Sequence, residues 1–212
     1  MIAKSLWSQL PEEVRQVFEK AAVNTTFKRG DYVYRAGENS KGLYFVKEGL
    51  IGLIMVGVSS GREHLLRFFR QDQFFGHRAL FSNEGYHASA LVMENSIVQM
   101  IPKTVVCEML AKNPQLFREI INVMAIELRH AEEQHILILE NEIVPRTASS
   151  LVYLKGIKPD HNWTRQEIAN YCGSTVSTVI KAMAVLEGMG LIRQSGREIT
   201  ILERDKLIAL QE

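Results

Sequence analysis

Cysteine is scarce in this sequence of 212 residues. The two cysteines, Cys107 and Cys172, lie far apart along the chain. Such a pair supplies neither a disulfide framework nor the ligand set of a zinc knuckle or an iron–sulfur cluster. We therefore expect no metal site, and we expect the protein to work in the reducing cytoplasm.

Long apolar runs are also missing. The longest uncharged apolar stretch, residues 49–60, is interrupted by Gly52 and Gly57 and is too short to cross a bilayer. The first residues lead into charged helical sequence and not into a secretory signal. With 46% hydrophobic and 23% charged residues, the composition is that of a folded globular protein. We expect no membrane partner.

The chain has little net charge. Its formal value of +1 argues against a polybasic nucleic-acid binder. The charge is divided unevenly, because residues 1–144 carry 16 Lys and Arg against 17 Asp and Glu, whereas residues 145–212 carry 9 against 7. A local patch matters more for phosphate binding than the total charge. The cations that bracket one short motif of the second region are Arg165, Lys181, Arg193 and Arg197.

Short runs of β-type sequence fill residues 28–101 and are separated by glycine-containing turns. This spacing predicts an antiparallel roll or barrel. A helix is expected before it, over residues 10–22, with Pro11 and Glu12 in its first turn. The expected strands are 31–35, 42–46, 50–56, 64–69, 87–92 and 96–101.

One long helix is expected over residues 113–141, with Asn113 as its N-cap and Pro114 at its first position. Its apolar residues are spaced alternately by four and three, which is the period of a coiled coil. We favour a dimer interface over the alternative of a core helix lying on the roll. The predicted interface residues are Phe117, Ile121, Met124, Leu128, Ala131, His135 and Ile138.

The strongest motif covers residues 163–192 and follows a predicted helix over 143–155. Thr164 and Glu167 have the spacing of a capping box, and Gly173 permits a sharp turn. Ser174 is expected to cap a second helix, which begins there and ends near Gly188. Two short runs of β-type sequence flank residues 195–197 and predict a β-hairpin. Together these features predict a winged helix-turn-helix that binds double-stranded DNA.

These segments resemble the cyclic-AMP receptor protein and FNR family of bacterial transcription regulators over nearly the whole chain. The matching stretches are 27–38, 43–49, 61–63, 74–77 and 164–192. The resemblance implies a homodimer, an effector pocket between roll and long helix, and a two-fold symmetric promoter site. RNA polymerase is the further partner it implies.

The expected fold is α+β. It comprises an N-terminal antiparallel β-roll of the cyclic-nucleotide-binding type, a long dimerisation helix, and a C-terminal winged helix-turn-helix. We assign these three parts to residues 1–112, 113–141 and 142–212.

The effector pocket departs from the cyclic-AMP-binding members of this family. Where they carry a glutamate after the pocket glycine, this chain has His77 after Gly76, and their phosphate-gripping Arg-Ser pair falls at Ala88 and Ser89. The polar pair of their long helix falls at Ala131 and Glu132. We expect a bound phosphate to lack a charged partner, and hence no physiological binding of cyclic AMP. The predicted pocket residues are Gly76, His77, Ala88, Ser89, Leu128 and Ala131.

Besides an unknown small effector, two other ways of controlling DNA binding remain open. Carbon-monoxide-sensing relatives place a haem ligand near His77, so haem is a candidate cofactor, although a lone histidine is more often structural. Alternatively, side chains fill the pocket permanently and the regulator binds DNA without a ligand. Candidates for that filling are Phe68, Phe69, Phe74, Phe75 and Phe81.

DNA recognition is assigned to the helix over residues 174–187. The family commonly carries Arg and Glu where this chain has Val176 and Ser177, so we expect weaker direct readout, with Val176 touching a thymine methyl and Lys181 reaching guanine or phosphate. The residues predicted to contact DNA are Thr164, Arg165, Gln166, Ser174, Thr175, Val176, Ser177, Thr178, Lys181, Arg193 and Arg197.

Two other classes of protein fit less well. A cupin-like metalloenzyme would need a His-x-His pair, which His64, His77 and His87 do not form. A scaffold dimer would leave the winged helix-turn-helix unexplained. We therefore predict that the chain is not an enzyme.

Overall fold

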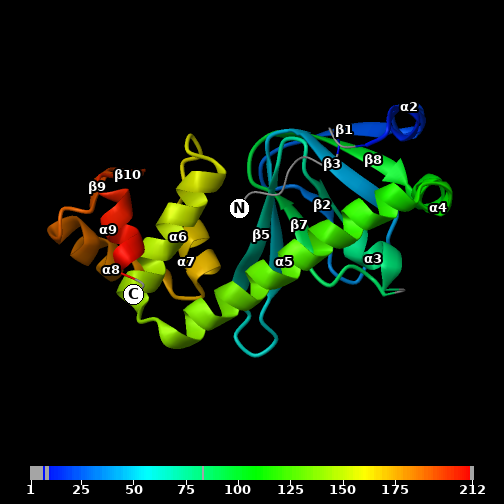
Figure 1. Ribbon diagram of the computed structural model, residues 1–212. Helices are drawn as coiled ribbons and strands as arrows, with labels where there is room; N and C mark the ends of the chain where they lie inside the picture. The colour runs from blue at the N-terminus through cyan, green and yellow to red at the C-terminus, as the bar shows by residue number, and fades with distance from the viewer. Residues whose placement is uncertain (1–6, 8–9, 83, 211–212) are drawn as a thin grey trace. The chain divides into compact units, whose positions relative to one another are not determined.

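The computed structural model describes residue 7 and residues 10–82 and 84–210. The chain forms two compact units (Figure 1). One comprises the described residues of Met1–Val56 together with Leu66–Arg129, and the other comprises Gly57–Leu65 and the described residues of His130–Glu212.

The first unit is built on two four-stranded sheets. One has the order β1 (Val23–Phe27), β8 (Ser96–Pro102), β3 (Gly42–Glu48), β6 (Phe74–Phe75). The other has the order β2 (Tyr32–Tyr34), β7 (Ser89–Val92), β4 (Leu50–Val56), β5 (Glu63–Arg70). Strands β1 and β3 pair antiparallel with β8, as β2 and β4 do with β7. The predicted antiparallel roll is confirmed.

Strand β3 is buried on both faces, and its side chains contribute alternately to two hydrophobic clusters. Leu43 and Phe45 pack into a cluster with the helices, whereas Tyr44 and Val46 pack into the interior of the roll. Successive side chains of a strand point to opposite faces, so one strand serves both clusters. Phe45 lies opposite Phe74 of β6 in the sheet register.

Short helices cover the outer face of the first sheet. Val14 and Phe18 of α2 (Glu12–Ala21) and Val106 and Met109 of α4 (Lys103–Lys112) join the cluster that contains Leu43 and Phe45. Helix α3 (His77–Phe81) follows β6 directly. The predicted helix over residues 10–22 is therefore present in slightly shorter form.

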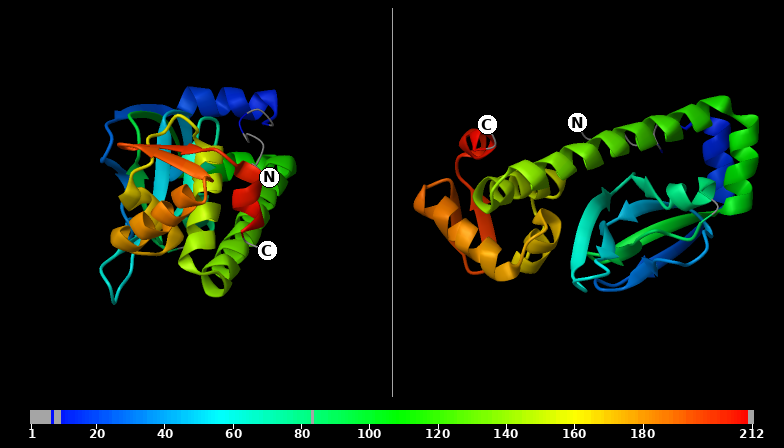
Figure 2. Two further views of the ribbon diagram at one scale, coloured as in Figure 1. Left: turned by 90° about the vertical axis from the view of Figure 1, so that its left-hand side faces the viewer. Right: turned by 90° about the horizontal axis from the view of Figure 1, so that it is seen from below.

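Helix α5 (Pro114–Glu140) is the long helix expected from the sequence (Figures 1 and 2). Leu116 and Ile120 near its beginning are buried in the same cluster as α2 and α4. Asn113 occupies the predicted N-cap position of α5, since its carbonyl accepts from the backbone N–H of Phe117 at 3.4 Å, but its side-chain amide donates to the carbonyl of Met109, 3.1 Å away. Its side chain thus helps to end α4, because the two helices are separated by this one residue.

The second unit is a small helical domain with a two-stranded ribbon (Figure 2). Helix α6 (Ile143–Ile157) packs against α7 (Arg165–Cys172), α8 (Val176–Gly188) and α9 (Arg204–Ala209). Strands β9 (Ile192–Ser195) and β10 (Glu198–Ile201) pair antiparallel. The winged helix-turn-helix architecture predicted from residues 163–202 is confirmed, and α6 runs two residues beyond its predicted end.

Candidate functional site

The first helix of the helix-turn-helix begins with a complete capping box. The Oγ1 of Thr164 accepts from the backbone N–H of Glu167 at 3.1 Å, and the backbone N–H of Thr164 donates to Oε2 of Glu167 at 2.8 Å. Two backbone donors at the start of α7 are thereby satisfied. Ile168 and Ala169 are fully buried behind this cap, which fixes α7 in the domain.

The turn between α7 and α8 corrects one sequence prediction. Gly173 has φ +66°, and the backbone N–H of Ser174 donates to the carbonyl of Ala169 at 3.0 Å. Ser174 therefore belongs to the turn that closes α7. The cap of α8 is Thr175, whose Oγ1 accepts from the backbone N–H of Thr178 at 3.2 Å.

Helix α8 has one buried and one exposed face. Val179, Ala182, Met183 and Leu186 are buried, as the sequence predicted. The predicted base-reading residues Ser177 and Lys181 are exposed, and Val176 is half-buried. Two further apolar side chains that sequence reasoning did not single out, Ile180 and Val185, are about half exposed.

The ribbon is fixed to the helices by a polar network. Arg165 donates from Nη1 to the carbonyl of Arg197 at 2.8 Å and from Nη2 to Oε1 of Gln194 at 2.9 Å. The backbone N–H of Gln194 donates to Oε1 of Glu187 at 2.6 Å. Arg165, predicted to contact phosphate, therefore holds the wing in place, whereas Arg193 and Arg197 are exposed. Gln194 and Glu187 are members that sequence reasoning missed.

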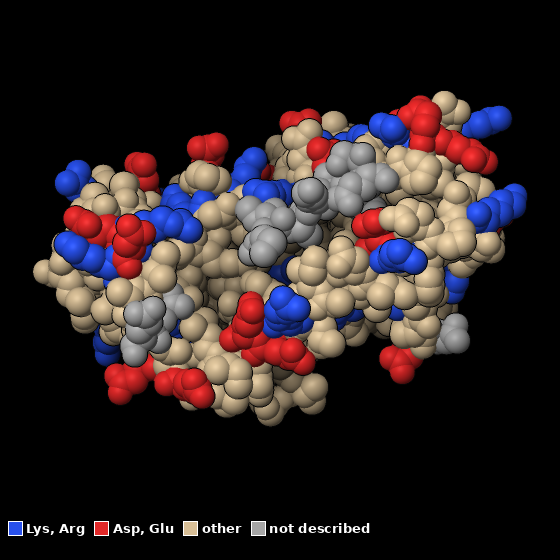
Figure 3. All heavy atoms as spheres, in the orientation of Figure 1, with Lys and Arg blue, Asp and Glu red and all other residues tan. Residues whose placement is uncertain are grey.

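The other predicted DNA contacts lie on the same unit. Gln166 is exposed, and the hydroxyls of Thr175 and Thr178 lie 2.7 Å apart. Acidic and basic side chains are interspersed on the face shown in Figure 3.

Most of the predicted dimer interface is exposed on α5. Phe117, Ile121, Leu128 and Ile138 have exposed fractions of 45%, 48%, 59% and 39%. Ala131 and His135 are exposed as well. Met124 differs, because it is half-buried against the cluster formed with α2 and α4. A row of large apolar side chains is thus left without a cover in one protomer.

The predicted effector pocket corresponds to a cavity of about 20 Å³ in the first unit. That volume is about the minimum that holds one water molecule. Of the predicted pocket residues, Gly76, His77 and Ala88 line it, and Ser89, Leu128 and Ala131 do not. Ser89 instead accepts at Oγ from the backbone N–H of Ala36, 2.9 Å away. The other lining residues are Tyr34, Leu53, Arg67, Phe69, Arg78, Ala79, Tyr86, His87 and Glu127.

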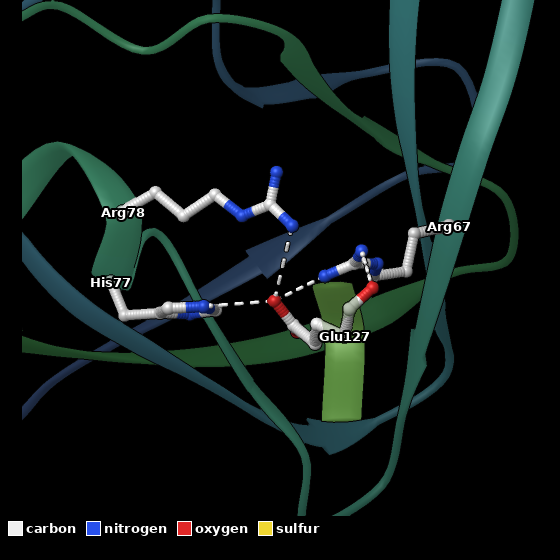
Figure 4. Close-up of polar contacts among 4 residues, drawn as sticks. All are labelled: Arg67, His77, Arg78 and Glu127. Carbon is white, nitrogen blue, oxygen red and sulfur yellow. Dashed lines mark hydrogen bonds and ion pairs between the residues drawn. The ribbon is translucent and has the colours of Figure 1, made fainter. Parts of the chain in front are cut away.

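Glu127 of α5 is the centre of a charged cluster at this pocket (Figure 4). Its Oε2 forms an ion pair with Arg67, lies 3.0 Å from Nε2 of His77, and lies 3.5 Å from Nη2 of Arg78. Arg67 also donates to the backbone carbonyl of Glu127 at 3.1 Å. Three basic side chains from β5 and α3 therefore converge on one carboxylate oxygen.

The cluster determines the ionisation of its carboxylate. Burial alone would raise the pKa of Glu127, but the hydrogen bond and charge of His77, together with Arg67, outweigh burial and lower this pKa to about 2. Burial, and then the charges of Arg78 and Arg67, lower the pKa of His87. Glu127 is therefore an anion at neutral pH.

This cluster corrects the sequence-based description of the pocket. We expected no charged partner for an anion, yet Arg67 and Arg78 both line the cavity. The long helix contributes Glu127 and not the residues near position 131. Of the phenylalanines expected to fill the pocket, Phe69 alone is among its lining residues. Phe81 is 39% exposed, and its ring contacts Phe117.

Gly76 allows the basic side chains to enter the pocket. It lies just before α3 with φ +82°, and a Cβ there would lie 2.9 Å from the ring of Tyr44. A side chain at this position is excluded by both the backbone conformation and the ring. The tight turn places His77 and Arg78 at the beginning of α3, where both line the pocket.

The residues present do not fit a haem in this conformation. His77 is 2% exposed, and its Nε2 is taken by Glu127. A cavity of about 20 Å³ has no room for a porphyrin. Within the described residues, no three His, Cys, Asp or Glu side chains are grouped to hold a metal ion. None of the described helices is both long and apolar enough to cross a membrane.

Two family models match the chain. The cyclic nucleotide-binding domain matches residues 24–113, and the Crp-like helix-turn-helix domain matches residues 145–210. The transcriptional activator protein Anr of Pseudomonas protegens is 28% identical, over 86% of this chain and 78% of that protein.

Solved structures show the same fold. FixK2 from Bradyrhizobium japonicum superposes with a TM-score of 0.79 at 23% identity, covering 89% of this chain and 96% of that one. A CRP/FNR-family transcriptional regulator from Thermus thermophilus has a TM-score of 0.75 at 25% identity, with 89% and 98% coverage. This family consists of transcription regulators and not of enzymes, as the sequence predicted. With its roll, long helix and winged helix-turn-helix, the chain belongs to the CRP/FNR family of DNA-binding transcription regulators.

Proposed function

We propose that the protein is a homodimeric regulator that binds a two-fold symmetric promoter site through α8. The observation that carries this proposal is the division of α8 into a buried face and an exposed face with Ser177 and Lys181 at its N-terminal half. The N-terminal residues of a recognition helix contact base edges in the major groove. Arg193 and Arg197 of the wing are assigned to phosphate.

The proposed dimer interface is the exposed apolar row of α5. Large contiguous apolar patches are unusual on monomeric proteins and mark interaction sites. Phe117, Ile121 and Leu128 fit the coiled-coil period, so a second copy of the same helix is the partner that matches them. A two-fold dimer presents two copies of α8, which accounts for a symmetric DNA site.

The proposed pocket does not take cyclic AMP. Its cations are already paired with Glu127, and its volume is far below that of a nucleotide. An unknown small effector and ligand-independent activity are the two forms of control considered. The small volume of the cavity favours ligand-independent activity. Haem-based sensing through His77 would require Glu127 to release Nε2 of His77.

We place the regulator in the cytoplasm, where promoter DNA and RNA polymerase, its proposed partner, are found.

Selection of binding sites from random double-stranded DNA tests this function. The purified full chain is expected to enrich sequences with two inverted half-sites centred about one helical turn apart, without any added ligand. The control is a variant with Ser177→Glu and Lys181→Glu, which places repulsive charge on the proposed reading face. Enriched sequences without inverted symmetry, or equal enrichment by the control, would contradict the proposal.

A further inference from the structure

The Glu127 cluster joins elements that are far apart in the sequence. Arg67 comes from β5, His77 and Arg78 come from α3, and the carboxylate comes from α5 (Figure 4). Glu127 is therefore a side chain of the long helix that reaches into the sensing pocket of the roll. It lines the same cavity as Gly76 and Ala88.

Burial makes these contacts strong and specific. The side chains of Arg67, His77 and Glu127 are 13%, 3% and 11% exposed. Water screens such charges poorly, so removing the carboxylate leaves the cations without a counter-charge in a desolvated site. Arg78 is more open, at 39%. The three basic side chains together form a small pocket that binds one carboxylate.

The site has more cationic than anionic groups. Two guanidinium groups face a single carboxylate, and His77 and His87 lie beside them. The Nδ1 atom of His77 is buried, and no hydrogen-bond partner for it occurs among the described residues. The geometry is therefore that of an anion-binding site whose occupant belongs to the chain itself.

We propose that Glu127 serves as a built-in effector: its carboxylate occupies the anion site of the pocket and fastens α5 to the roll, so that the regulator binds DNA without a small molecule. This inference rests on the proposed function, because the readout is DNA affinity. An external effector that displaced this carboxylate would have to be a small anion of similar size.

Chemical rescue tests the proposal. Glu127→Ala removes a fragment equivalent to acetate from the anion site. We expect its affinity for the selected DNA site to fall at least tenfold and to return toward the wild-type value in millimolar sodium acetate. Sodium pivalate at equal concentration provides the same charge and ionic strength but is too bulky for the site, so it is not expected to rescue. Glu133→Ala, an exposed glutamate of the same helix, serves as the matched control and should bind DNA like wild type.

A second readout does not depend on DNA. Acetate should raise the melting temperature of Glu127→Ala by several degrees and leave that of wild type unchanged. It should not raise that of Glu127→Ala combined with Arg67→Met, which lacks the main guanidinium of the site. If Glu127→Ala does not fold, Glu127→Gln keeps the side-chain shape, and its DNA affinity should fall while its circular dichroism stays native.

The outcomes separate this inference from the proposed function. Wild-type DNA affinity in Glu127→Ala or Glu127→Gln without acetate would overturn the built-in effector and leave DNA recognition by α8 intact. Equal rescue by acetate and pivalate would also overturn it, because the effect would then be one of salt. A wild-type protein that selects no symmetric site contradicts the proposed function, and the melting experiment alone then decides whether the anion site exists.

Discussion

At the scale of single residues, Glu127 is the carboxylic acid that lines the pocket, and its surroundings lower its pKa. Its pKa is near 4.5 in an unfolded chain and about 2 in the folded protein. The folded state therefore favours the charged carboxylate. This contribution is fully present above pH 4.5 and is lost as the pH falls toward 2.

We predict that acidification from pH 5 to pH 2.5 removes up to about 3 kcal/mol of folding free energy through this one group. Urea unfolding at a series of pH values measures the change. Glu127→Gln should flatten the acid limb of the profile, whereas Glu133→Gln should keep it. Identical acid limbs in wild type and Glu127→Gln would show that the carboxylate is not stabilised by its neighbours.

Lys181 is the single cation on the exposed face of α8 within the described residues. Lys181→Ala is expected to weaken binding to the selected site by about 1–3 kcal/mol if Lys181 contacts a base. Competition against random DNA measures how much of this loss in binding free energy is sequence-specific. Lys206→Ala, on α9 of the same unit, is the control. An equal loss on random DNA would assign Lys181 to phosphate.

At the scale of elements, α5 has two different faces. One carries Glu127 and the buried Leu116 and Ile120, and the other carries the exposed apolar row. Leu128 is 59% exposed, so replacing it should hardly change the stability of a protomer.

Leu128→Glu is predicted to convert a dimer into a monomer, because it places like charges opposite each other at the seam. Light scattering should give a mass near 24.1 kDa for this variant and twice that for wild type. Asn122→Glu adds the same charge at an exposed position outside the row and should stay dimeric. A dimeric Leu128→Glu would exclude this face as the interface.

The elements themselves were largely predictable, since their signals are local. The capping box of Thr164, the turn at Gly173 and the glycine-punctuated strands each depend on neighbours a few positions away. The prediction of Ser174 as the cap of α8 is wrong by one residue, because Thr175 can cap a helix as well and the backbone N–H of Ser174 donates to the carbonyl of Ala169.

The composition of the pocket was less predictable. Arg67 and Phe69 alternate on one strand and both line the cavity. A charged residue at an inward position of a strand was therefore the available signal. Glu127 lies beside the heptad row of apolar residues and is not part of it, so the heptad pattern does not predict Glu127 as a pocket residue. The contact between Arg67 and Glu127 depends on how α5 packs against the roll, and no local sequence pattern specifies that packing.

At the scale of the whole molecule, a nucleotide-binding fold is combined with a pocket unsuited to a nucleotide. We predict no heat of binding when cyclic AMP is titrated into the full-length protein at micromolar concentrations, because Arg67 and Arg78 are already paired with Glu127 and a cavity of about 20 Å³ does not admit a nucleotide. Isothermal titration calorimetry provides the measurement. A saturable isotherm with micromolar affinity would contradict this description of the pocket.

The convergence of three basic side chains on one oxygen of Glu127 also constrains how this sequence can diverge. A change at position 127 alone leaves Arg67, His77 and Arg78 facing one another in a buried site, and a change at Arg67 alone leaves the buried Glu127 with only His77 and Arg78 as partners. Descendants of this regulator should therefore exchange positions 67 and 127 as a pair. A lineage that keeps the arginine and loses the glutamate would be one that has come to depend on an acid supplied by its surroundings.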